Sequence, residues 1–147
     1  MESRKILIAS DHAGFLQKEF LKEKLIEANF QVQDEGCHSR ESVHYPEFAA
    51  LVAGKIKAGF QGYGVLICGS GQGMMMAANR FSGLRAGLAW NEEIARLMRS
   101  HNDAQIICFG ARFTADEYAW QMLQVFLNTP FEGGKHAVRT GIMDKIA

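Results

Sequence analysis

Short apolar runs alternate with longer amphipathic segments along this 147-residue chain. The pattern predicts strands at residues 6–9, 30–36, 64–68, 84–90 and 104–109. It predicts helices at residues 15–29, 46–58, 74–80, 91–100 and 114–127, with Pro46 at the first helical position of the second, Asn91 and Thr114 as N-caps of the last two, and a helical tail after Gly133-Gly134. Strands that alternate with helices indicate a parallel sheet covered on both faces, so we expect an α/β protein.

Composition and charge narrow the class of protein further. Hydrophobic residues make up 48% of the chain and charged residues 22%, which excludes a mainly disordered or collagen-like protein. Lys plus Arg and Asp plus Glu each number 16, so nothing indicates a nucleic-acid or membrane-surface partner, and charge repulsion between copies is small. We expect one domain over residues 1–147.

The cysteine count bears on the cellular compartment. Cys37, Cys68 and Cys108 form no CxxC pair, and three is an odd number, which argues against a disulfide framework or a structural zinc site. No apolar stretch of about 18 residues occurs, and the first apolar run is too short for a signal peptide. These features predict a protein of the reducing cytoplasm without a membrane span.

A glycine-rich loop follows the third predicted strand, with the sequence Cys68-Gly69-Ser70-Gly71-Gln72-Gly73. A turn of this kind that enters a helix points backbone N–H groups at one spot, which suits a phosphate or a developing oxyanion. Met74 stands where a dinucleotide-binding fingerprint needs glycine, and the lysine of a Walker loop is absent. The alternative is a tight strand–helix turn without a ligand.

Cys68 and His101 are the two candidate acid–base residues. A thiol at the mouth of a turn that enters a helix has its thiolate form favoured, although a free cysteine is just as often a small buried apolar residue. His101 precedes the fifth strand, so it should lie at the opposite end of the sheet from Cys68 of the same chain. It therefore serves a neighbouring subunit's site, has an unusual geometry, or is a histidine at a helix C-terminus.

Basic residues also gather near the C-terminus. Lys135, His136 and Arg139 follow Gly133-Gly134, and Lys135 and Arg139 share one face of a helix. The two glycines ahead of them favour an anion-binding turn, and the alternative is a solvated charged face.

Taken together, these stretches resemble the ribose-5-phosphate isomerase B family, which also contains galactose-6-phosphate and allose-6-phosphate isomerase activities. The matching stretches run through nearly the whole chain: residues 8–14 (IASDHAG), 45–49 (YPEFA), 67–74 (ICGSGQGM), 77–80 (AANR), 101–104 (HNDA), 110–112 (GAR) and 131–136 (FEGGKH). The resemblance implies a three-layer α/β/α sandwich with a five-stranded, parallel, Rossmann-like sheet. It also implies a homodimer or homotetramer with sites at the subunit interface, and no metal or other cofactor.

The resemblance further implies an aldose–ketose isomerase that converts ribose 5-phosphate and ribulose 5-phosphate through an enediolate. Cys68 would be the base at carbon, and His101 would open the sugar ring. The other implied residues are Ser70 with Gly69, Gly71, Gln72 and Gly73 for the anion hole, Asp11 and Asn102 for sugar hydroxyls, and His12, Arg112, Lys135 and Arg139 for the phosphate.

Three positions depart from the family pattern. Ser70 replaces the usual threonine and keeps the hydroxyl, and Lys135 replaces a frequent arginine and loses its bidentate fork. His44 stands where ribose-type members often have aspartate, and galactose-6-phosphate isomerase subunits can also show a His-Tyr-Pro stretch. The stretches at residues 101–103 (HND) and 133–136 (GGKH) favour the ribose type, and a six-carbon substrate such as galactose 6-phosphate or allose 6-phosphate is the alternative. A non-catalytic phosphate- or nucleotide-binding module is the alternative from another class.

Overall fold

Five parallel strands form one sheet in the computed structural model, which describes residues 4–146. The strands are β1 (Lys5–Ser10), β2 (Gln31–Gly36), β3 (Tyr63–Cys68), β4 (Ala86–Leu88) and β5 (Ile106–Gly110). Their order across the sheet is β2-β1-β3-β5-β4, so the chain moves to one side of β1 first and to the other side afterwards. Ligand sites of doubly wound sheets lie at the carboxyl ends of the strands beside such a reversal, here between β1 and β3.

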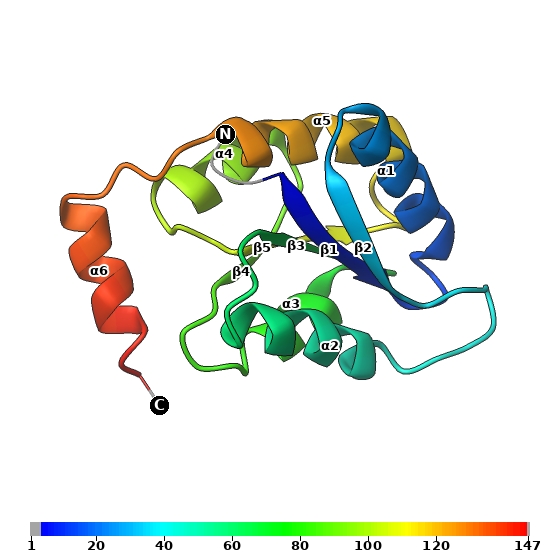
Figure 1. Cartoon of the computed structure of the whole chain (residues 1–147), viewed down its shortest axis with the longest axis horizontal. Coiled ribbons are helices and arrows are strands. Elements are labelled where there is room, and N and C mark those ends of the chain that lie inside the picture. The colour runs from blue at the N-terminus through cyan, green and yellow to red at the C-terminus, as the bar shows by residue number, and fades with distance from the viewer. Residues whose placement is uncertain (1–3, 147) are drawn as a thin grey trace.

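Helices cover both faces of this sheet, which confirms the predicted three-layer α/β/α sandwich (Figure 1). The helices are α1 (Phe15–Glu27), α2 (Tyr45–Lys57), α3 (Gln72–Ala78), α4 (Glu92–Ser100), α5 (Asp116–Asn128) and α6 (Lys135–Met143). α1, α4 and α5 lie on one face, and α2 and α3 lie on the other (Figure 1). Because both faces are covered, the central strands read as continuous apolar runs rather than alternating ones.

The core follows the two-residue period of the strands. Along β1, Ile6 and Ile8 pack with the residues of α1 and α5, whereas Leu7 and Ala9 pack with those of α2 and α3. All four side chains are fully buried. The sheet is therefore held from both sides, and its strand ends are rigid places on which to build a site.

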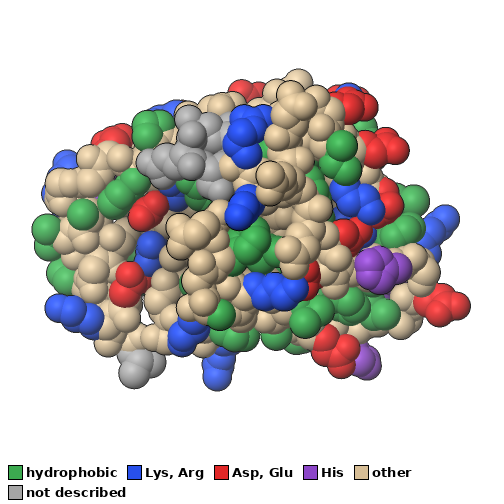
Figure 2. All heavy atoms as spheres, viewed as in Figure 1, with side chains coloured by type: hydrophobic (Ala, Val, Ile, Leu, Met, Phe, Trp, Pro, Cys, Tyr) green, Lys and Arg blue, Asp and Glu red, His purple; other side chains and the backbone are tan. Residues whose placement is uncertain are grey.

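α6 lies apart from the three layers (Figure 1). Its apolar side chains Val138 and Ile142 are 64% and 61% exposed, and Ile146 beyond it is 69% exposed. Figure 2 shows the surface of the molecule from the same side as Figure 1, with Lys and Arg side chains interspersed among Asp and Glu side chains. Within residues 4–146, none of the helices combines the length and apolar character that crossing a membrane requires.

Several sequence-based bounds differ from the structure; α3, for example, spans Gln72–Ala78 rather than residues 74–80. The strand expected at residues 84–90 is only Ala86–Leu88, because the Arg85 backbone N–H donates to the side chain of Gln105 instead of to a neighbouring strand. Thr114 does not cap α5: the N-cap is Ala115, and the Thr114 carbonyl accepts a hydrogen bond from Gln17. Asn91 does cap α4, since its Oδ1 accepts the Ile94 N–H at 2.8 Å.

Candidate active site

The loops after β1, β3 and β5 meet at the carboxyl edge of the sheet. Ser10 pairs with Ile67, and Cys68 pairs with Gly110, so the three strands end side by side. The Asp11 N–H donates to the Ile67 carbonyl at 3.1 Å, which joins the first loop to the third strand. These ladder bonds hold the three loops at the switch point, where a ligand can contact all of them.

The glycine loop turns sharply from β3 into α3. Gly71 is the N-cap of α3 and has a φ of 80°, a left-handed conformation that favours glycine. A Cβ at Gly69 would lie 2.9 Å from the guanidinium of Arg112, so the missing side chain lets Arg112 cross the loop. The Arg112 N–H also donates to the Gly69 carbonyl at 3.0 Å. Arg112 is thus brought to the glycine loop.

Cys68 and Ser70 begin this loop. Cys68 is 5% exposed at the end of β3, and Ser70 is exposed. The Ser70 hydroxyl oxygen accepts the Gln72 N–H at 3.3 Å, so its own proton can be donated to an anion in the loop. Burial raises the pKa of the Cys108 thiol well above its ordinary value, which leaves that cysteine protonated and inert.

Asp11 and His12 also lie at this carboxyl edge of the sheet, in the loop after β1. Asp11 is buried, and its Oδ1 accepts the Gly14 N–H at 3.1 Å, so one of its oxygens shapes the turn into α1. The His12 Nδ1 accepts the Val43 N–H at 3.2 Å. A neutral His12 ring must therefore carry its proton on Nε2, which makes Nε2 a hydrogen-bond donor.

The remaining predicted site residues lie at the other end of the sheet. His101 is the C-cap of α4 and precedes β5, whose Ile106 pairs with Gly64 at the start of β3. Four residues of strand, or about 13 Å, separate this register position from that of Cys68. Lys135 and Arg139 are exposed on α6, whose His136 ring stacks on the His101 ring at 4.0 Å. The structure therefore places the predicted site residues in two groups, one at the carboxyl edge of the sheet and one at its opposite end.

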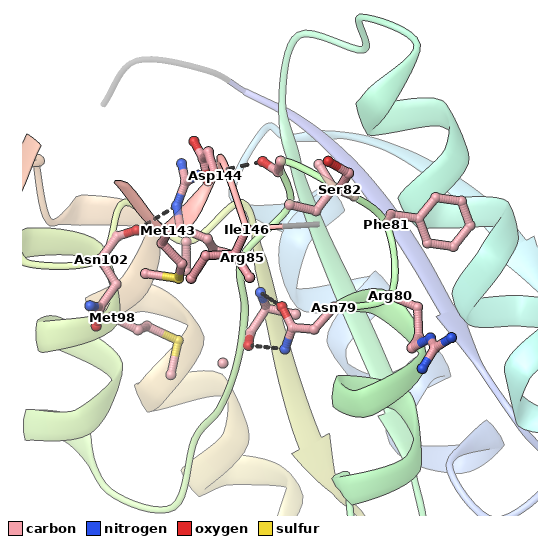
Figure 3. A pocket seen from close by; sticks show the side chains of 15 residues that line it. Asn79, Arg80, Phe81, Ser82, Arg85, Met98, Asn102, Met143, Asp144 and Ile146 are labelled. Carbon is pink, nitrogen blue, oxygen red and sulfur yellow. Dashed lines mark hydrogen bonds and ion pairs between the residues drawn. The ribbon is translucent and has the colours of Figure 1, made fainter. Parts of the chain in front are cut away.

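Asn102 borders a cavity of about 680 Å³ at this second group (Figure 3). Arg85 lies between Asn102 and the end of α6: its Nε donates to the Asn102 carbonyl at 2.8 Å, and its Nη1 pairs with Asp144 at 2.5 Å. Met98, Met143 and Ile146 supply the apolar lining. Arg85 thus ties the α4–β5 loop to the C-terminal helix and fixes the relative position of their basic residues.

Sequence reasoning missed three neighbours of the site. The Tyr45 ring lies over Gly73, where a Cβ would meet its Cε1 at 2.4 Å. The Val43 backbone N–H sets the hydrogen bonding of His12, and Glu132 pairs with both His101 and His136. No local pattern could reveal a backbone donor 31 residues from its acceptor, but the His-Tyr-Pro stretch next to a predicted helix was a visible signal.

Fold and site together define a doubly wound α/β protein with a buried thiol and a glycine-rich loop at the switch point of its sheet. Residues 6–143 match the Ribose/Galactose Isomerase family, and the chain belongs to that family. The ribose-5-phosphate isomerase B of Escherichia coli K12 is 38% identical over 136 residues, which cover 92% of this chain and 91% of that protein. The resemblance seen in the sequence is confirmed.

Solved structures agree with this assignment. A ribose 5-phosphate isomerase from Thermotoga maritima superposes with a TM-score of 0.94 at 44% identity and covers 97% of this chain and 98% of its own. The ribose-5-phosphate isomerase B of Mycoplasma genitalium, solved with bound ribulose-5-phosphate, has a TM-score of 0.91 at 38% identity and covers 96% and 94%. The fold is therefore that of these isomerases along nearly the whole chain.

Proposed function

We propose that this protein is an aldose–ketose isomerase that interconverts ribose 5-phosphate and ribulose 5-phosphate. Membership of the Ribose/Galactose Isomerase family supports the reaction class, and the names of its relatives support the pentose phosphate. The observation that carries the proposal is the position of Cys68, a nearly buried thiol at the point where β3 opens into the glycine loop. A module that only binds phosphate would have no use for this thiol.

The reaction needs a base at carbon and donors for the oxygen that becomes negative. The Cys68 thiolate removes the proton from C2 of the open aldose, and the C2–H electrons form the C1–C2 double bond of the enediolate. Negative charge on O1 is met by the Ser70 hydroxyl and by N–H groups of the loop from Gly69 to Gly73. The Cys68 thiol then returns its proton to C1, and a proton moves between O2 and O1 to leave the ketose.

Ring opening is assigned to His101 of a second copy of the chain. The cyclic aldose opens when an acid protonates the ring oxygen and a base takes the proton of the C1 hydroxyl. His101 and Cys68 lie at opposite ends of the sheet, which supports a site shared by two subunits. Exposed apolar side chains on α6 support the homodimer that this requires, and such dimers could pair into tetramers.

Phosphate and hydroxyl binding is divided between the same two chains. His12 Nε2–H and Arg112 approach from the chain that supplies Cys68, and Lys135 and Arg139 come from the partner. Arg and Lys both suit a phosphate dianion, although only arginine offers a bidentate fork. Asp11 and Asn102 are assigned to sugar hydroxyls. Three free cysteines support the reducing cytoplasm as the compartment.

One observation favours a six-carbon substrate as the second candidate. His44 is the N-cap of α2, directly before the Tyr45 ring that lies over Gly73 of the glycine loop. A side chain at this place can contact the end of a longer sugar. Galactose 6-phosphate and allose 6-phosphate are therefore the substrates to compare.

The test is initial-rate isomerisation of ribose 5-phosphate, galactose 6-phosphate and allose 6-phosphate by the purified protein. We expect the highest kcat/KM for ribose 5-phosphate and the loss of that activity in Cys68→Ala. A higher kcat/KM for either hexose phosphate would transfer the assignment to the second candidate. Failure to turn over any of the three, or full activity in Cys68→Ala, would contradict the proposal.

A further inference from the structure

His101, Glu132 and His136 form a cluster of three potential metal ligands beside the start of α6. The His101 Nε2 lies 3.8 Å from one Glu132 oxygen, and the His136 Nε2 lies 3.5 Å from the other. One ligand atom from each residue can be chosen so that all three lie within 4.8 Å of one another. Among the residues that the structure describes, this is the group in which three such donors meet.

The donor set and its spacing suit a transition metal. Two imidazole nitrogens and one carboxylate oxygen are the ligands of one common class of zinc site, in which a fourth position stays open. Ligands about 2.0–2.1 Å from a tetrahedral ion lie roughly 3.4 Å apart. The three ligand atoms lie within 4.8 Å of one another, so they must draw together by at most about 1.4 Å. Glu132 lies in the loop before α6, and the chain turns at Gly133 and Gly134 so that its carboxylate faces His136.

The two histidine rings need a larger adjustment. They are stacked with an angle of 11° between their planes, whereas an ion bound to both nitrogens should lie near both ring planes. His101 is 39% exposed and can rotate, while His136 is 11% exposed and provides the fixed ligand. Gly133 and Gly134, both with positive φ, give the Glu132 segment freedom to follow.

Charge around the cluster leaves its ligands available. The His136 Nε2 faces the Glu132 carboxylate, so it is the ring nitrogen placed to coordinate an ion. Glu132 supplies the negative charge. Lys135 and Arg139 oppose a cation from α6, and Arg96 and Glu93 on α4 form an ion pair with each other.

We propose that His101, Glu132 and His136 bind a divalent transition metal ion of the zinc type, and that this ion inhibits the isomerase. The inhibition rests on the proposed function, because the ion takes the His101 nitrogen that would open the sugar ring. Glu132 pairs with His101 but is assigned no contact with the sugar phosphate. Its removal therefore tests the metal site through the Zn²⁺ concentration that halves the rate of each variant.

Binding is tested first without reference to activity. In Cys68→Ser, which removes the competing thiol, Co²⁺ should develop the intense visible absorption of a four-coordinate site, and Zn²⁺ should abolish it. Adding Glu132→Gln should weaken the Co²⁺ affinity by at least about tenfold, whereas Glu117→Gln on the exposed first turn of α5 should leave it unchanged. No such absorption, or an affinity that Glu132→Gln leaves unchanged, would overturn the site.

Inhibition is tested in the chain that keeps Cys68. Measured against its own rate without metal, Glu132→Gln should need at least about ten times more Zn²⁺ for half inhibition, and Glu117→Gln should match the unsubstituted protein. If Glu132→Gln and the unsubstituted protein were equally sensitive to Zn²⁺, the inhibitory ion would bind elsewhere. The proposed inhibition through this site would then be wrong. Absence of any isomerase activity would refute the proposed function, while the Co²⁺ absorption would still decide the metal site.

Discussion

Gly110 at the end of β5 controls the position of the glycine loop. A Cβ at this residue would lie 2.5 Å from the Ser70 carbonyl oxygen and 2.6 Å from its carbon. The two loops cannot simply separate, because the Ala111 N–H donates to the Cys68 carbonyl at 2.9 Å. Gly110 does not have positive φ, so alanine itself fits the backbone there. Gly110→Ala therefore tests the approach of the two loops and little else.

The size of the effect expected for Gly110→Ala follows from how closely the added Cβ would approach Ser70. Ordinary van der Waals contact begins near 3.4 Å, so Ser70 must retreat by about 0.9 Å from its 2.5 Å contact. Overpacking of this kind typically costs about 1–3 kcal/mol of stability. A displacement of about 1 Å at catalytic groups can cost about 10²-fold in rate. We expect kcat to fall by roughly that factor while the protein still folds.

The assay measures kcat, KM and thermal unfolding of Gly110→Ala beside a matched Gly54→Ala. A Cβ at Gly54, inside α2, would meet only Phe81 at 4.0 Å, so that variant should keep full activity and gain about 0.5–1 kcal/mol. Unchanged kcat and stability in Gly110→Ala would refute the reasoning. It would mean that the loop shifts freely and that its position does not govern the reaction.

Three further predictions follow from single side chains. Cys68→Ala should lose about two to four orders of magnitude in isomerisation rate yet still bind the sugar phosphate, and near-normal turnover would contradict its role as base. Arg139→Ala should weaken inhibition by a phosphorylated sugar acid by about 1.5–3 kcal/mol but not by an unphosphorylated one, and equal losses would deny it a phosphate contact. Burial would raise the pKa of Asp34, but hydrogen bonds from Lys18 and Lys22 hold it below its usual range. The folded carboxyl thus binds its proton less readily than the unfolded one, and the stability it contributes is present above about pH 4 and lost as pH falls through the lowered pKa. Asp34→Asn should therefore cost about 1.5–3 kcal/mol in urea unfolding at pH 7 and much less in strong acid, and a pH-independent cost would contradict the ion pair.

The sequence predicted the central features of the fold because their signals are local. The run from Ile6 to Ala9 is apolar on both strand faces, which is typical of a parallel strand covered by helices, and β1 has that environment. The loop from Cys68 to Gly73 could likewise be placed at a carboxyl strand end, because it follows a predicted parallel strand along the chain. Residue type and chain direction sufficed for these inferences.

Contacts between distant segments could not be predicted in the same way. Glu132 reaches His101 from far along the chain, and the partnership depends on the path of the chain after α5. The strand expected at residues 84–90 was shortened by Gln105, whose side chain accepts the Arg85 N–H at 2.7 Å. The position of His101 far from Cys68 was predicted because the end of a parallel strand is known once its direction is known.

The most direct test of a site shared by two chains is complementation between two inactive variants. Cys68→Ala and His101→Ala are each expected to be inactive as homodimers. When they are co-refolded in equal amounts, half of the dimers are mixed and each mixed dimer has one intact site, so activity should return to about a quarter of the wild-type value. If mixed dimers form and no activity returns, Cys68 and His101 act within one chain, and the shared site is wrong.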